Sequence, residues 1–103
     1  MAEDTGKIFI TIETDLAGLI PGYLANRRKD IESMNAALDS GDFEAIRKTG
    51  HQLKGSGGGY GFDFISDTGK AIELAAKDNN PEEIIRHIAA LGDYIDRLEI
   101  VYE

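Results

Sequence analysis

The strongest constraint on the fold is an apolar pattern in the last quarter of the chain. Residues three or four positions apart lie on one face of a helix, and apolar side chains recur here at those steps. They are Ile84, Ile88, Leu91, Ile95, Leu98 and Tyr102. Asn80 can cap such a helix, and Pro81 suits its first turn, where no backbone N–H is needed. We therefore predict an amphipathic helix that begins at Pro81 and continues through Tyr102.

Three earlier stretches repeat this helical pattern. The first begins at Pro21 and stops at Gly41, the second covers residues 42–60 with Asp42 as its cap, and the third begins after Phe62. Their inner faces comprise Leu24, Ile31, Met34 and Leu38 in the first, Phe43, Ile46, Gly50, Leu53, Gly57 and Tyr60 in the second, and Phe62, Ile65, Gly69, Ile72 and Ala76 in the third. Four amphipathic helices with short connections predict an all-α fold, an antiparallel up-and-down four-helix bundle.

The segment before the bundle is predicted to be extended. Residues 7–12, KIFITI, are the only stretch rich in β-branched and aromatic residues, and we find no second strand in the sequence to pair with it. We expect an N-terminal strap over residues 1–13 whose isoleucines lie against the bundle; the alternative is edge pairing between two chains. The bundle then covers residues 14–103 and opens with a short first helix over residues 16–20.

The composition narrows the choice of partners and compartment. With 19 acidic and 11 basic residues the formal net charge is −8, so nucleic acid and anionic membranes are poor partners. Arg27 and Arg28 are interpreted as solvated residues of the first long helix, without a catalytic role. The absence of cysteine excludes disulfides and thiolate chemistry. With no apolar run as long as a membrane span and no secretion signal, we expect a cytoplasmic protein. We also expect a monomer that needs no cofactor.

A glycine-rich stretch, HQLKGSGGGYG, occupies residues 51–61. Glycine-rich loops that bind phosphate follow a strand and end in Lys and Ser or Thr at the start of a helix, whereas here a helix precedes and Phe62 follows. Glycine inside a helix costs roughly 0.5 to 1 kcal/mol against alanine, so this run needs a reason. We interpret Gly57, on the apolar stripe, as close packing, and Gly55 and Gly58 as a surface kept bare for another protein.

His51 lies off the apolar stripe of its helix, on a flank that also carries Arg47, Lys48 and Lys54. A neutral imidazole is a competent nucleophile near pH 7 and becomes a reactive phosphoramidate once phosphorylated. Lys54 can then neutralise the charge of the incoming phosphoryl group. A metal site built from His51 and His87 is not expected, because the spacing and the carboxylate cluster are missing.

Glu73 is the candidate that orients the imidazole. If the chain turns at Gly61, His51 lies about 15 Å before the turn and Glu73 about 18 Å after it, at roughly 1.5 Å per helical residue. The two residues are then level on antiparallel helices. The carboxylate could accept a hydrogen bond from Nδ1–H and leave Nε2 free to attack. Lys70 is a weaker second candidate for a cation beside the phosphoryl group.

These residues resemble a known signature. The resemblance to histidine-containing phosphotransfer (HPt) domains rests on His51, Leu53, Lys54, Gly55, Ser56, Gly58, Gly61 and Phe62. It implies a four-helix bundle whose second long helix presents a phosphorylatable histidine to response-regulator receiver domains. By this resemblance His51 is the phospho-accepting residue, Lys54 the cation beside the phosphoryl group, and Gly55 and Gly58 the small residues that admit the receiver. The extra glycines at positions 57 and 59 depart from the pattern.

Three functions follow, from different classes. The first is a phosphorelay intermediate that accepts a phosphoryl group on His51 and passes it to or from a receiver aspartate, with a histidine kinase or hybrid kinase upstream. The second is an interaction module that docks receivers without transfer. The third, a small enzyme, is the weakest, because a bundle of this length offers no enclosed pocket. We expect no kinase activity, and Mg²⁺ and the other catalytic groups are expected on the receiver.

Overall fold

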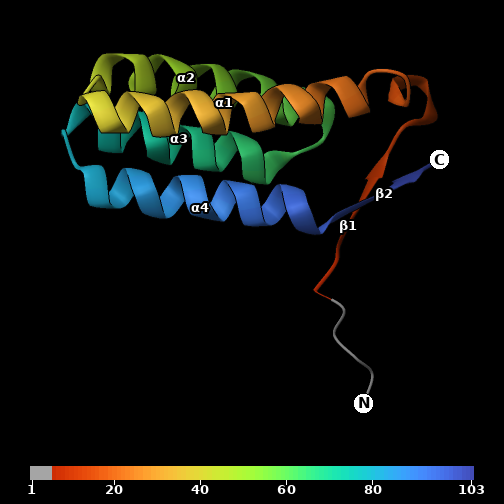
Figure 1. The fold of residues 1–103 in the computed structure, drawn as a ribbon. Coiled ribbons are helices and arrows are strands. Elements are labelled where there is room, and N and C mark those ends of the chain that lie inside the picture. Colours follow the sequence, from red (N-terminus) through yellow and green to blue (C-terminus); the bar gives the residue numbers. More distant parts are fainter. Residues whose placement is uncertain (1–5) are drawn as a thin grey trace.

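Four α-helices lie within residues 6–103, the part of the chain that the computed structural model describes. They are α1 (Ile20–Ser40), α2 (Phe43–Gly57), α3 (Asp63–Lys77) and α4 (Pro81–Arg97). Figure 1 shows that each helix runs in the direction opposite to the helix before it, joined by short connections. The predicted four-helix bundle is confirmed. Residues 1–5 of the expected strap lie outside the described part.

The helix ends follow the local signals in the sequence. Asp42 accepts a hydrogen bond from the backbone N–H of Ala45 (3.1 Å), and Asn80 accepts one from Glu83 (3.2 Å). Gly41 ends α1 with φ 72°, a left-handed conformation that costs glycine nothing. The predicted caps at Asp42 and Asn80 and the predicted stop at Gly41 are therefore confirmed. These helix ends could be predicted because each depends only on residues close to it in the sequence.

The start of the bundle differs in detail from the prediction. The short first helix expected over residues 16–20 is a single 3₁₀ turn, η1 (Thr14–Leu16), and α1 already begins at Ile20, so Pro21 takes its second position. Proline is tolerated there as well, since the first turn of a helix has no partner for its N–H groups.

The two ends of the described chain form a parallel pair of strands. Strand β1 (Ile8–Ile12) pairs with β2 (Leu98–Tyr102), with Ile8 opposite Leu98 and Ile12 opposite Tyr102. The predicted extended segment is confirmed, and Ile8, Ile10 and Ile12 pack against the core as predicted. The expectation that it has no partner strand is wrong, and so is the prediction of a last helix through Tyr102. A step of four residues, as from Leu98 to Tyr102, keeps side chains on one face in a strand as well as in a helix, so the apolar spacing could not separate the two.

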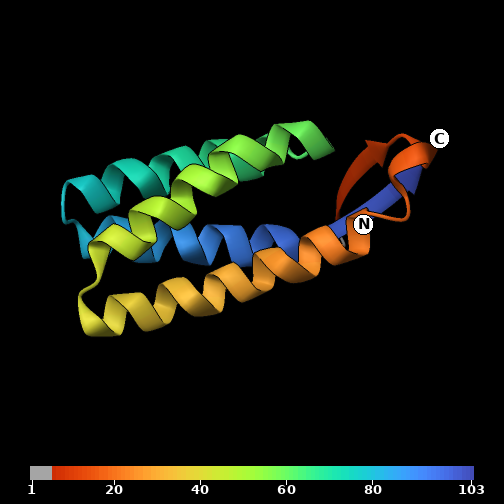
Figure 2. The same ribbon diagram turned by 90° about the horizontal axis from the view of Figure 1, so that it is seen from above.

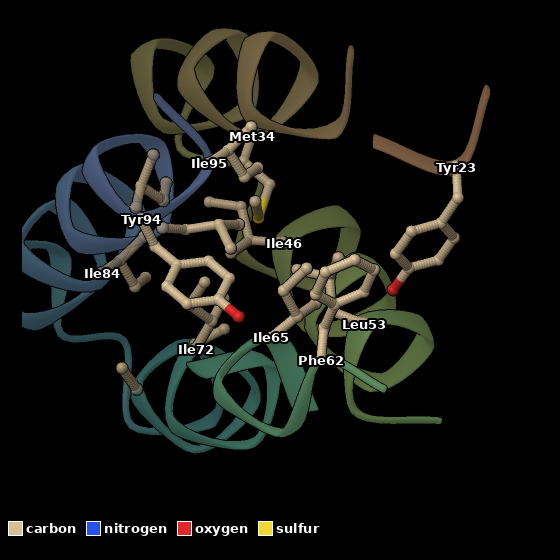
Figure 3. Packing of buried hydrophobic residues seen from close by; sticks show 14 of the residues in the cluster. Tyr23, Met34, Ile46, Leu53, Phe62, Ile65, Ile72, Ile84, Tyr94 and Ile95 are labelled. Atoms are coloured by element: carbon tan, nitrogen blue, oxygen red, sulfur yellow. The ribbon is translucent and has the colours of Figure 1, made fainter. Parts of the chain in front are cut away.

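The core fills the inside of the bundle and extends to the strands. Figure 3 shows side chains from all four helices meeting there, among them Met34, Ile46, Ile72 and Ile84. Ile12 of β1 is buried against the end of the bundle, where a Cβ added at Gly61 would lie only 2.8 Å from its Cδ1. Within residues 6–103, no helix combines the length and apolar content needed to cross a bilayer.

Candidate functional site

The site is built on an unusually close contact between α2 and α3. A Cβ added at Gly50 would lie 2.8 Å from the Glu73 nitrogen and 2.9 Å from the Gly69 oxygen. One added at Gly69 would lie 2.5 Å from the Lys54 nitrogen and 2.7 Å from the Gly50 oxygen. Side-chain atoms cannot be accommodated at these separations, so the two backbones touch directly. This contact brings Glu73 beside His51, the residue that follows Gly50.

A single carboxylate contacts both candidate side chains of α2. The His51 Nδ1 lies 3.0 Å from Glu73 Oε2, and the Lys54 Nζ lies 3.1 Å from Glu73 Oε1. The Glu73 side chain is 8% exposed, whereas the His51 side chain is 62% exposed. With the ring proton on Nδ1, that N–H donates to Glu73 and Nε2 keeps its lone pair. The imidazole is therefore fixed through one nitrogen, and the ring as a whole is open to solvent.

The charge state of Glu73 suits this arrangement. The hydrogen bond from Lys54 lowers the pKa of Glu73 below its ordinary value, and the hydrogen bond with His51 lowers it further, although burial acts in the opposite direction. Glu73 is therefore a carboxylate at neutral pH. An ionised carboxylate accepts hydrogen bonds only, so it fixes the donor positions of both partners.

The other cations predicted near His51 form no ion pair with Glu73. The guanidinium of Arg47 forms two hydrogen bonds with Glu44, at 3.0 and 2.6 Å. The pKa of Arg47 is raised, chiefly by Glu44 and to a smaller degree by the charge of Glu73. Lys48 and Lys70 are exposed and form no ion pair within residues 6–103. Of the predicted cations, only Lys54 is brought into contact with Glu73.

The glycines at the end of α2 divide into two kinds. A Cβ added at Gly55 or Gly59 would meet nothing within 4 Å, and one at Gly58 would make only ordinary contacts, at 3.5 and 3.7 Å. A Cβ added at Gly57 would lie 2.6 Å from the Ser66 nitrogen, in the contact with α3. The interpretation of Gly57 as close packing is confirmed. Gly55 therefore leaves the surface of α2 bare one helical turn after His51, and Gly58, the residue that follows α2, is exposed as well.

The interpretation of Arg27 as a solvated residue is wrong. Its side chain is 16% exposed, its guanidinium lies 4.5 Å from the centre of the Tyr23 ring, and its Nε lies 2.9 Å from Asp30. It also donates a hydrogen bond to Ser56 of α2 (3.3 Å). The sequence could have indicated this contact, because Tyr23 and Arg27 are four residues apart on one helix face and guanidinium groups stack on aromatic rings. Arg28, 51% exposed, is solvated as predicted.

Comparison with known proteins gives one result. A family model, the Hpt domain, matches residues 19–100, and no curated protein and no solved structure gives a match. The matched part contains all four helices together with His51, Lys54 and Glu73, whereas β1 lies outside it. Hpt domains are phosphotransfer modules of two-component signalling, whose partners include receiver domains and histidine kinases. With most of its length matched and an exposed imidazole fixed from one side, the chain belongs to the Hpt domain family.

Proposed function

We propose that this chain is a phosphorelay intermediate in which His51 accepts a phosphoryl group and exchanges it with the aspartate of a response-regulator receiver. A histidine kinase, free or as part of a hybrid, stands upstream, and the chain has no kinase activity of its own. Transfer between such partners occurs in the cytoplasm. The observation that carries this proposal is the hydrogen bond between Nδ1 of an exposed imidazole and a buried carboxylate.

The chemistry follows from which nitrogen is free. The lone pair on Nε2 of His51 forms a bond to phosphorus while the bond from phosphorus to the aspartate oxygen breaks, and the aspartate leaves as a carboxylate. The ring keeps its proton on Nδ1 and so becomes positively charged. The carboxylate of Glu73, 3.0 Å from Nδ1, stabilises that charge. Transfer to a second receiver is the reverse of these steps.

Lys54 supplies charge stabilisation for the phosphoryl group. Its side chain is 40% exposed, and its Nζ lies 3.1 Å from Glu73, the same carboxylate that binds the imidazole. The stem of lysine is flexible, so Nζ can turn from the carboxylate towards a phosphoryl oxygen as negative charge develops during transfer. Such an interaction acts mainly in the transition state, and it therefore affects the rate more than the affinity for the receiver.

The bare surface of α2 suits the approach of a receiver. Gly55 and Gly58 leave room for a partner's backbone. Arg47, which is paired with Glu44, and the exposed Lys48 and Lys70 are basic residues of the same two helices as His51 and Glu73. The chain as a whole carries −8, so these basic residues would favour the approach of an anionic aspartyl phosphate to this part of the molecule. A docking module without transfer would use the same surface, and the experiment must separate the two.

The experiment is transfer of radioactive phosphate from phosphorylated receivers to the protein, with His51→Gln and His87→Gln as a matched pair of variants. The native protein and His87→Gln should become labelled and His51→Gln should not, and the label should be lost in acid, as expected for a phosphoramidate. Label on His51→Gln would refute the assignment of the accepting residue. Receiver binding without label on the native protein would favour the docking module.

A further inference from the structure

The hydroxyl of Ser66 is inserted into the backbone hydrogen-bond ladder of α2. Ser66, in the first turn of α3, accepts a hydrogen bond from the N–H of Gly58 (2.8 Å) and donates one to the carbonyl of Lys54 (2.9 Å). These two backbone groups are four residues apart, and in a regular α-helix they would bond to each other directly. The insertion occurs where α2 ends and the 3₁₀ turn η2 (Gly58–Tyr60) begins.

Gly57 makes the insertion possible. A Cβ at this position would lie 2.6 Å from the Ser66 nitrogen and 2.9 Å from the Ser66 Oγ. Gly57 also accepts a hydrogen bond from the N–H of Phe62 (2.8 Å), which ties the start of α3 to the same point. The hydroxyl of Ser66, which is half-buried, is therefore held in a fitted position by two hydrogen bonds to α2 and its end.

Three residues of α3 hold Lys54 from one side. Ser66, Gly69 and Glu73 lie on one helix face, at steps of three and four residues. Ser66 binds the Lys54 carbonyl, Gly69 lies against the Lys54 amide, where an added Cβ would be 2.5 Å away, and Glu73 binds the ammonium group at 3.1 Å. The backbone and the side chain of this one lysine are thus both fixed by α3.

We propose that Ser66 is a positioning residue for phosphotransfer, which keeps the backbone of Lys54 in the place from which its side chain reaches the phosphoryl group. The proposal rests on the proposed function. Without the hydroxyl, the N–H of Gly58 is free to bond to the Lys54 carbonyl directly, so α2 lengthens into η2 and the stem of Lys54 turns with it. Ser66 then acts on the rate through Lys54 and touches neither the phosphoryl group nor the imidazole.

The test combines kinetics and the amide of Gly58, with Ser66→Ala and, as a control, Ser33→Ala, which removes an exposed hydroxyl from α1. Ser66→Ala should slow transfer at saturating receiver by about tenfold to a hundredfold, with a smaller change in the receiver concentration for half-maximal rate. In a Lys54→Ala background the same substitution should have no further effect. The NMR shift and hydrogen exchange of the Gly58 amide should change in Ser66→Ala and stay unchanged in Ser33→Ala.

The outcomes separate the possibilities. Equal slowing by Ser66→Ala with and without Lys54 would overturn the positioning role and leave a structural one. An unchanged Gly58 amide in Ser66→Ala would show that the hydroxyl is not inserted, and the inference would fail. If the native protein takes up no phosphoryl group while the Gly58 amide still responds, the proposed function fails and the role in transfer fails with it, but the insertion itself stands.

Discussion

The pair α2 and α3 and the pair α1 and α4 are held together in different ways. Gly50 and Gly69 bring the backbones of α2 and α3 into contact, whereas glycines in the other pair face open space or ordinary contacts: a Cβ at Gly22 would meet nothing within 4 Å, and one at Gly92 would lie 3.8 Å from Ile31. Figure 2 shows α2 and α3 side by side while α1 and α2 diverge from their connection. Side-chain packing can adjust to change, but backbone contact cannot. The site therefore sits on the pair with the least freedom to shift.

The largest expected effect comes from breaking the close contact. Gly69→Ala should destabilise the protein by about 3 kcal/mol, because the new methyl group meets backbone atoms of α2 that cannot move aside, and this outweighs the better helix propensity of alanine. Urea unfolding measures the change. Gly92→Ala is the matched control, in α4, and should leave stability unchanged or raise it by up to about 1 kcal/mol. Similar losses for both variants would mean that the two pairs do not differ.

A smaller effect is expected from the carboxylate that the close contact brings to His51. Glu73→Gln should leave the fold intact and slow phosphotransfer on the order of tenfold, because an amide neither balances a charged imidazole nor fixes which ring nitrogen carries the proton. Transfer kinetics at saturating receiver check this. A rate equal to that of the native protein would make Glu73 a structural partner only.

The same variant has a pH signature. The pKa of Glu73 is lowered from an ordinary value of 4.5, so its contribution to stability is complete above that pH and is lost as the pH falls towards the lower folded value. Glu73→Gln should remove this acid-dependent part of the unfolding free energy. Glu83→Gln is the control, because hydrogen bonds from Arg86 lower the pKa of Glu83 on α4. It should change the acid profile and leave transfer unaffected.

The smallest effect is expected at Gly55, on the face of α2 that does not contact α3. Gly55→Ala should stabilise the isolated protein by up to about 1 kcal/mol, since the methyl group enters free space and the unfolded chain loses freedom. Gly55→Gln should keep the melting temperature but weaken receiver binding, because its side chain would occupy the bare surface. A lower melting temperature with normal receiver binding would show that this glycine is packed and that receivers dock elsewhere.

The sequence predicted features that depend on near neighbours better than features that depend on contact between helices. Asp42, Asn80 and Gly41 mark helix ends by interactions within a few residues, so they could be read directly. Counting residues from the turn at Gly61 predicted that Glu73 and His51 lie at the same level, because two helices joined by a short turn have the same rise per residue. In the structure, Nδ1 of His51 lies 3.0 Å from Oε2 of Glu73.

Most of the contacts that escaped prediction cross from one element to another; the exceptions are those of Arg27 with Tyr23 and Asp30, which lie within α1. A glycine on the apolar face of a helix does not indicate whether side-chain or backbone atoms of the neighbouring helix pack against it. The backbone contact between Gly50 and Gly69 could therefore not be predicted from the sequence. The hydroxyl of Ser66 could equally have faced solvent. Strand β2 was taken for the end of a helix because its partner, β1, lies at the other end of the sequence.

The long separation of β1 and β2 in the sequence leads us to expect an order of assembly. Ile8 pairs with Leu98, 90 residues along the chain, and closing a flexible loop of that length costs about 4 kcal/mol in chain entropy. The helices of the bundle connect neighbours in sequence and need no such closure, so we expect them to form first and to bring the two strands towards each other. By this argument the strand pair closes last and opens first, and the proposed phosphotransfer site on α2 and α3 is expected to be in place before the strands pair.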